Sequence, residues 1–177
     1  MDIKVATWNI RGLCTSDKQD EVRKLINEEK LQICAIIETH VKFQKVNKMG
    51  QAVFGNWEFV TNAEDNNKGC RVMVGWNQNK VNAWLIAKTK QSMLFLFETT
   101  CQKSKFFCSF VYASNSGVER RNLWKELGAY RQIINKQPWV VSGDFNVTLD
   151  PKEHSNGCSA PSNDMIENVD IECLIQS

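Results

Sequence analysis

The sequence predicts an α/β fold built on mixed β-sheets, and two patterns in it lead to that prediction. A strand–helix–strand pattern occupies roughly the first forty residues, and five β-rich runs separated by short polar turns follow it. The first pattern favours a parallel strand pair joined by a right-handed crossover, and the second favours an antiparallel meander. With 177 residues, 42% of them hydrophobic, the chain is long enough to bury a sizeable core.

Each element of the opening pattern has its own signal. Residues 3–8 alternate with β-branched side chains and predict a strand that ends at Asn9. Residues 17–30 place apolar side chains at helical spacing among charged ones, which predicts an amphipathic helix. Residues 31–37 form a short apolar run, which predicts a buried strand that ends at Glu38.

The rest of the chain continues in β-rich runs, one helix and a last strand. The predicted meander consists of the runs 57–61, 70–76, 80–87, 92–99 and 105–113. Ser116 and Glu119 have the spacing of a capping box, which predicts a helix with Leu123 and Leu127 on its apolar stripe. Residues 139–142 predict another strand, and the pattern decays after residue 150.

Composition and charge exclude several classes of protein. The net charge is only +2, so the strong basic excess of a non-specific nucleic-acid binder is absent. The seven cysteines include no C-x-x-C pair, which argues against a zinc site, and an odd number of thiols fits a reducing compartment. No signal peptide and no apolar run of about 18 residues is visible, so we expect an intracellular protein that does not contact a membrane.

Polar residues follow the predicted strands at their carboxyl ends: Asn9, Glu38, Tyr112, and Asp144 with Asn146. Active sites of open α/β sheets collect at such strand ends. Carboxylates directly after buried runs are candidates for holding a hard cation such as Mg²⁺. The alternative for each single residue is that it caps a helix or starts a turn.

Four motifs occur in order after predicted strands: WNIRGL at 8–13, Glu38-Thr39, VYASN at 111–115 and SGDFN at 142–146. In this order they resemble the endonuclease/exonuclease/phosphatase superfamily, the DNase I-like proteins. Residues 119–124 (ERRNLW) and 138–146 (PWVVSGDFN) are most similar to the endonuclease domain of plant LINE-type, non-LTR retrotransposons. The resemblance runs from about Lys4 to about Glu153.

The resemblance implies a DNase I-like four-layer sandwich, with two packed mixed β-sheets flanked by helices and an incomplete second sheet. It implies one C-terminally truncated domain over residues 1–155, followed by an irregular tail over 156–177. It also implies a metal site in which Glu38 is the ligand and Asn9 orients the site, with Mg²⁺ or Mn²⁺ as the cation.

For catalysis, the resemblance implies that Asp144 orients or deprotonates the attacking water and that Tyr112 hydrogen-bonds the scissile phosphate. Asn146 would hold the phosphate and the developing charge, and Asn115 would lie near the substrate phosphate. These roles suit hydrolysis of a phosphodiester.

The sequence departs from the family at its C-terminal Asp-His pair, usually S-D-H, because nothing after Asn146 matches it. His154 lies only eight residues past Asn146, in a turn-rich segment, and is not expected to replace the missing histidine. His40 is interpreted as a surface-loop residue rather than one that approaches the metal, and nothing specific assigns Arg71 to the substrate.

Three hypotheses on function follow. The leading one is a divalent-metal-dependent DNA endonuclease from a LINE-type element, with DNA as substrate, a monomeric state and a nuclear location. A former fusion to a reverse transcriptase stays open. The second is a catalytically inactive truncated remnant, so whether the chain is an enzyme stays open. The third is a phosphoinositide or sphingolipid phosphoesterase of the same fold.

Overall fold

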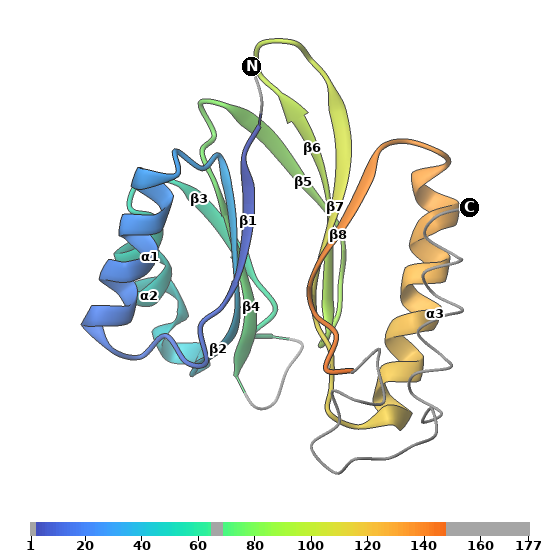
Figure 1. The fold of residues 1–177 in the computed structure, drawn as a ribbon, viewed down its shortest axis with the longest axis horizontal. Helices are drawn as coiled ribbons and strands as arrows, with labels where there is room; N and C mark the ends of the chain where they lie inside the picture. The colour runs from blue at the N-terminus through green and yellow to red at the C-terminus, as the bar shows by residue number, and fades with distance from the viewer. Residues whose placement is uncertain (1–2, 65–68, 148–177) are drawn as a thin grey trace, which may run out of the picture. The chain divides into compact units, whose positions relative to one another are not determined.

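The structure is a computed structural model that describes residues 3–64 and 69–147 (Figure 1). The chain divides into two compact units. The first extends to Tyr112 and includes Ile134–Asp144, and the second contains Ala113–Ile133 and continues from Phe145. The predicted domain limit at residue 155, the tail and His154 lie outside the described residues.

The first unit contains two four-stranded mixed sheets. The strands of the first sheet, in spatial order, are β1 (Val5–Asn9), β2 (Ile33–Val41), β4 (Cys70–Trp76) and β3 (Glu58–Thr61). Those of the second are β5 (Val81–Lys88), β6 (Ser92–Thr99), β7 (Lys105–Tyr112) and β8 (Trp139–Asp144). The helices of this unit are α1 (Ser16–Glu28), the short 3₁₀ turn η1 (Phe43–Lys45) and α2 (Val46–Phe54).

Strand pairing confirms the predicted parallel pair and corrects the predicted meander. β1 and β2 are parallel across α1, and β7 and β8 are also parallel. The five β-rich runs do not form one meander, because β3 and β4 join the first sheet and β5, β6 and β7 form the second. The physical reason lies in β2, which is apolar on both faces and is therefore shielded best as an inner strand, between β1 and β4.

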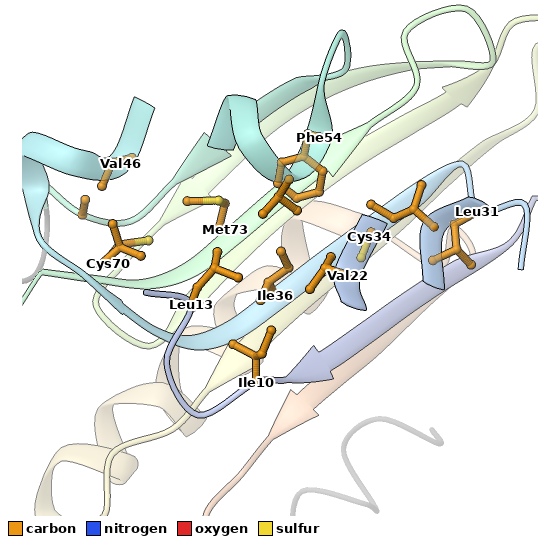
Figure 2. Packing of buried hydrophobic residues seen from close by; sticks show 14 residues of the cluster. Ile10, Leu13, Val22, Leu31, Cys34, Ile36, Val46, Phe54, Cys70 and Met73 are labelled. Carbon is orange, nitrogen blue, oxygen red and sulfur yellow. The ribbon is translucent and has the colours of Figure 1, made fainter. Parts of the chain in front are cut away.

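Alternate side chains of β2 enter two different hydrophobic clusters. Cys34 and Ile36 pack with residues of α1 and α2, and Figure 2 shows this cluster between the helices and the sheet. Ile33, Ala35 and Ile37 point the other way, into a cluster shared with the second sheet. The two sheets of this unit therefore pack face to face, with α1 and α2 on the outer face of the first sheet.

Two cysteines are part of these clusters, as predicted from the apolar runs around them. Burial raises the pKa of the Cys34 thiol and of the Cys108 thiol to about 12. Both thiols therefore stay neutral at physiological pH and pack as small hydrophobic groups.

Helix α2 was not predicted from the sequence. It is only nine residues long, and Gly50 in its middle is a poor helix former. The structure explains this glycine: a Cβ there would overlap the ring of Phe59 on β3. Close packing against the neighbouring strand thus requires a residue that weakens the local helical signal.

The second unit contains α3 (Gly117–Ile134) up to Ile133, and this helix begins directly after Ser116 as the sequence predicts. Leu123 and Leu127 of its expected apolar stripe are buried. The ring of Trp124 stacks on Phe145, with 5.9 Å between the ring centroids. Among the helices described, none is long and apolar enough to cross a membrane.

A buried asparagine joins three segments of the first unit. Asn62 follows β3 and is fully buried. Its side-chain oxygen accepts hydrogen bonds from the backbone N–H groups of Arg71, at 3.0 Å, and Val72, at 2.9 Å. Its side-chain nitrogen donates to the carbonyls of Thr89, at 3.2 Å, and Lys90, at 3.0 Å. Asn62 therefore ties the start of β4 to the turn between β5 and β6.

We predict that Asn62→Ala destabilises the protein by roughly 3 kcal/mol, because it removes four hydrogen bonds and leaves buried backbone groups unpaired. Urea unfolding measures this difference in the free energy of unfolding. Asn27→Ala, at an exposed position of α1, is the matched control and should change stability by less than about 0.5 kcal/mol. Equal stability of the two variants would contradict the role of Asn62.

Candidate active site

Asn9 and Asp144 meet although 135 residues separate them in sequence. Asn9 is the last residue of β1 in the first sheet, and Asp144 is the last residue of β8 in the second. The side-chain nitrogen of Asn9 donates a hydrogen bond to Asp144 Oδ2 at 2.7 Å. This bond joins the carboxyl ends of the two strands and fixes the direction of the Asp144 carboxylate.

The loop after Asn9 is held to β2 by backbone hydrogen bonds. The N–H groups of Ile10, Gly12 and Leu13 donate to the carbonyls of Ile37, Glu38 and Thr39, at 3.2, 2.7 and 2.8 Å. Lys18 of α1 binds the carbonyls of Ile10 and Arg11 with its ammonium group, at 2.8 and 2.9 Å. The WNIRGL motif thus clamps the segment that carries Glu38.

That segment is a bulge inside β2. The prediction that the strand ends at Glu38 is wrong, because β2 continues to Val41. Glu38 and His40 both have left-handed backbone conformations, with φ of 58° and 52°, and the pairing of β2 with β4 shifts register there. The buried hydroxyl of Thr39 donates to the carbonyl of Cys70 at 2.8 Å, which holds the bulge against β4.

The bulge brings Glu38, His40 and Arg71 into one row. His40 Nε2 lies 3.3 Å from Glu38 Oε1, and Arg71 Nη1 contacts both ring nitrogens of His40. In the arrangement that gives each donor an acceptor, neutral His40 donates from Nε2 to Glu38 and accepts from Arg71 at Nδ1. The interpretation of His40 as a surface-loop residue is right about its exposure, but His40 lies in β2 rather than in a loop and contacts Glu38 and Arg71.

Tyr112 lies close to the same charged groups. Burial raises the pKa of its phenol above the ordinary value of 10.0, the carboxylates of Glu38 and Asp144 raise it further, and Arg71 lowers it. Tyr112 ends β7, and its Cα pairs with that of Asp144. The structure therefore gathers Asn9, Glu38, Tyr112 and Asp144 in the first unit.

The two other candidate residues belong to the second unit. The side-chain nitrogen of Asn146 donates to the carbonyl of Ala113 at 2.5 Å, and its backbone is left-handed, with φ of 51°. Asn115 is exposed in the segment that leads into α3. The asparagine of SGDFN thus holds the chain that follows β7, which a sequence motif alone does not indicate.

The glycine of the SGDFN motif, Gly143, is required for a steric reason. Gly143 has φ of 153° and pairs with Val111, and a Cβ at this position would overlap the Val111 backbone. Only glycine allows β8 to approach β7 this closely while Asp144 follows directly.

The side chains at this site provide hard oxygen donors: the carboxylates of Glu38 and Asp144 and the amide oxygen of Asn9. Within residues 3–64 and 69–147, no group of three His, Cys, Asp or Glu side chains is close enough to hold a metal by itself. Mg²⁺ commonly uses one or two carboxylates and completes its shell with water and substrate phosphate. The residues present therefore fit a magnesium ion that shares its shell with the substrate.

Residues 6–171 match the sequence profile of the Endonuclease/Exonuclease/phosphatase family. The chain belongs to this family. The match covers all the motifs described above and extends beyond the described residues. No curated protein matches the sequence.

Solved structures show that the fold is that of the family. A family protein from Bacteroides thetaiotaomicron aligns with a TM-score of 0.62 at 15% identity, over 87% of this chain and 66% of that one. The mannosyl-6-phosphatase of B. thetaiotaomicron VPI-5482 gives 0.63 at 13% identity, over 88% and 68%. The endonuclease domain of TRAS1, a telomere-specific non-LTR retrotransposon, gives 0.63 at 11% identity, over 83% and 60%.

Identities this low establish the fold alone, and the predicted α/β architecture of two packed mixed sheets with flanking helices is thereby confirmed. The chain spans between 60% and 68% of the length of these three structures. Within the described residues of this chain, the second sheet has four strands.

We predict that Gly143→Ala destabilises the protein by roughly 2–4 kcal/mol, because the added methyl group forces β8 away from β7. Gly128→Ala on α3, where a Cβ meets no atom within 4 Å, is the control and should stabilise by about 0.5–1 kcal/mol. Urea unfolding of both variants measures the contrast. Two similar effects would contradict the close approach of the strands.

We predict that the Tyr112 phenol ionises above pH 10.0, because burial and the neighbouring carboxylates disfavour the phenolate. The sequence has two tyrosines, so the ultraviolet titration of the wild type minus that of Tyr112→Phe isolates Tyr112. In Glu38→Gln the midpoint should move down, toward the ordinary value. A wild-type midpoint at or below 10.0 would contradict the arrangement.

Proposed function

We propose that the chain is a divalent-metal-dependent phosphodiester hydrolase of endonuclease type that acts on DNA. The observation that carries this proposal is the hydrogen bond from Asn9 to Asp144, at 2.7 Å, beside Glu38 and Tyr112. It joins the end of β1 in the first sheet to the acidic group at the end of β8 in the second, next to a phenol that stays protonated. Such a site suits a substrate with a charged phosphate and an attacking water.

Each residue of the first unit has a distinct role in this proposal. The Asp144 carboxylate, oriented by Asn9, orients or deprotonates the attacking water. The protonated Tyr112 hydroxyl donates a hydrogen bond to a non-bridging oxygen of the scissile phosphate. Together they act on the water and on the phosphate.

The residues of the second unit have phosphate-binding roles that rest on the motif resemblance. Asn146 holds the phosphate as charge develops on it, and Asn115 lies near the same group. Both are amides, which donate to an anion without adding charge.

Glu38 and Asn9 are the residues that hold Mg²⁺ or Mn²⁺ in this proposal, because both offer hard oxygen donors. When bound, the cation neutralises negative charge on the phosphate oxygens. The chain's own contribution is to fix the Glu38 carboxylate, whose backbone is held by Gly12 at 2.7 Å and by the Thr39 bond to β4.

A LINE-type origin in plants is part of the same proposal. It is supported by residues 119–124 and 138–146, whose sequence is similar to plant LINE endonuclease domains, and by the fold shared with the TRAS1 endonuclease domain. A nuclear location, a monomeric state and a former fusion to a reverse transcriptase belong to this hypothesis.

We predict that Asp144→Ala lowers plasmid nicking by the 177-residue chain in Mg²⁺ by roughly 10²–10⁴-fold, because it removes the group that activates water. Asp20→Ala is the matched control, since Asp20 is an exposed residue of α1 that pairs only with Arg23 among the residues described. Chelation of the metal should abolish nicking by the wild type.

Three outcomes would reject the assignment or part of it. Equal nicking by the wild type and Asp144→Ala would reject the site. No nicking by a folded wild-type chain would favour the inactive remnant, and hydrolysis of phosphoinositides or sphingolipids without nicking would favour the third hypothesis.

A further inference from the structure

Arg71 is held at the edge of the candidate site by its backbone. It follows Cys70 at the start of β4, opposite the bulge of β2 that carries Glu38 and His40. Its N–H group donates to the buried side chain of Asn62 at 3.0 Å. The position of the side chain is therefore fixed at its base, on an element of the first sheet.

Among the residues that the structure describes, the guanidinium of Arg71 has no acidic partner. Within residues 3–64 and 69–147, its polar side-chain contact is with His40, through Nη1, and no carboxylate lies within ion-pair distance. A guanidinium has five N–H donors, so most of them stay available. A partly buried cation without a carboxylate partner is suited to bind an anion.

His40 keeps this cation apart from the nearest acid. Its ring lies between Arg71 and Glu38, with Nε2 at 3.3 Å from Glu38 Oε1. A direct ion pair would satisfy both charges and leave neither for a ligand. With the imidazole ring between them, the carboxylate remains available to a cation and the guanidinium to a phosphate.

Arg71 also acts on the side of the site where the phosphate is expected. Its charge opposes the effect of Glu38 and Asp144 on the Tyr112 phenol, so the guanidinium lies within electrostatic range of that hydroxyl. Tyr112 is the residue that contacts the scissile phosphate in the proposed function.

We propose that Arg71 binds a backbone phosphate of the DNA substrate through the guanidinium N–H groups that His40 leaves free. His40 is then a positioning residue that orients the guanidinium and separates it from Glu38. This inference rests on the proposed function and adds a substrate-binding residue to it. A planar guanidinium suits this role because it binds two phosphate oxygens with parallel hydrogen bonds.

The test is the salt dependence of DNA binding, which reports the number of phosphates that the protein neutralises. A fluorescein-labelled DNA duplex is titrated with the full chain by anisotropy, without divalent cations so that it is not cut. Arg71→Gln should weaken binding by roughly tenfold at low salt. It should also reduce the slope of log K against log salt by about 0.9, the value for one phosphate contact.

Two further variants separate phosphate binding from a structural effect. Lys24→Gln on α1, an exposed position with the same change in charge, should leave the slope unchanged. Arg71→Lys keeps the charge and should keep the slope, with a loss of affinity because the planar donor pair is gone. Melting curves of all variants establish that each one is folded.

An unchanged slope in Arg71→Gln would overturn the inference, and so would a slope lost equally in Arg71→Lys, which would indicate a change in β4. These outcomes leave plasmid nicking by the wild type intact, so the proposed function would stand. A folded wild-type chain that neither binds nor nicks DNA would overturn both.

Discussion

The site depends on the backbone hydrogen bonds between the loop after β1 and the bulge in β2. Three N–H groups of residues 10–13 donate to three consecutive carbonyls, from Ile37 to Thr39. In a regular strand, successive carbonyls point to opposite sides, so one loop could not bind three in a row. The left-handed conformation at Glu38 makes this possible, and the same bonds hold Glu38 in that conformation. The loop and the bulge therefore depend on each other, and together they position the Glu38 carboxylate.

Part of the backbone strain lies in this arrangement. Among the described residues, four of the eight left-handed non-glycine positions lie in or beside the motifs of the site: Arg11, Glu38, His40 and Asn146. Each such position costs about 1–3 kcal/mol unless its surroundings compensate. Compensation for the bulge comes from buried groups: the Thr39 hydroxyl on the Cys70 carbonyl, and Ile10 and Leu13 packed in the core below the loop. The core thus stabilises the geometry that the site needs.

Local patterns allowed most of the fold to be predicted from the sequence. The eight strands within the described part of the chain all coincide with apolar or alternating runs, because the signal for a strand is contained within the strand itself. Helix α2 was missed because the glycine in its middle, Gly50, is required by close packing against Phe59, which lies outside the helix. The splitting of the meander into two sheets was missed for a related reason, since neighbouring runs in sequence do not determine which sheet they join.

The candidate site shows the same division between local and long-range information. Four site residues were identified because each one follows or ends a strand that the sequence pattern predicts: Asn9, Glu38, Tyr112 and Asp144. The row formed by Glu38, His40 and Arg71 was not, because it depends on a contact across 31 residues between a bulge and the strand opposite it.

The net charge of +2 suggested little about a polyanionic substrate, because composition does not tell where charges lie. In the structure, the charges close to the site matter more than the net charge of the chain. The Arg71 guanidinium, without a carboxylate partner among the described residues, acts on the same phenol as Glu38 and Asp144, and the His40 ring separates it from Glu38. A site of this kind carries both signs of charge at separate positions, which is what a substrate phosphate bound together with a cation requires. In the proposed function, a chain of balanced net charge therefore binds a phosphodiester through the local placement of its charges.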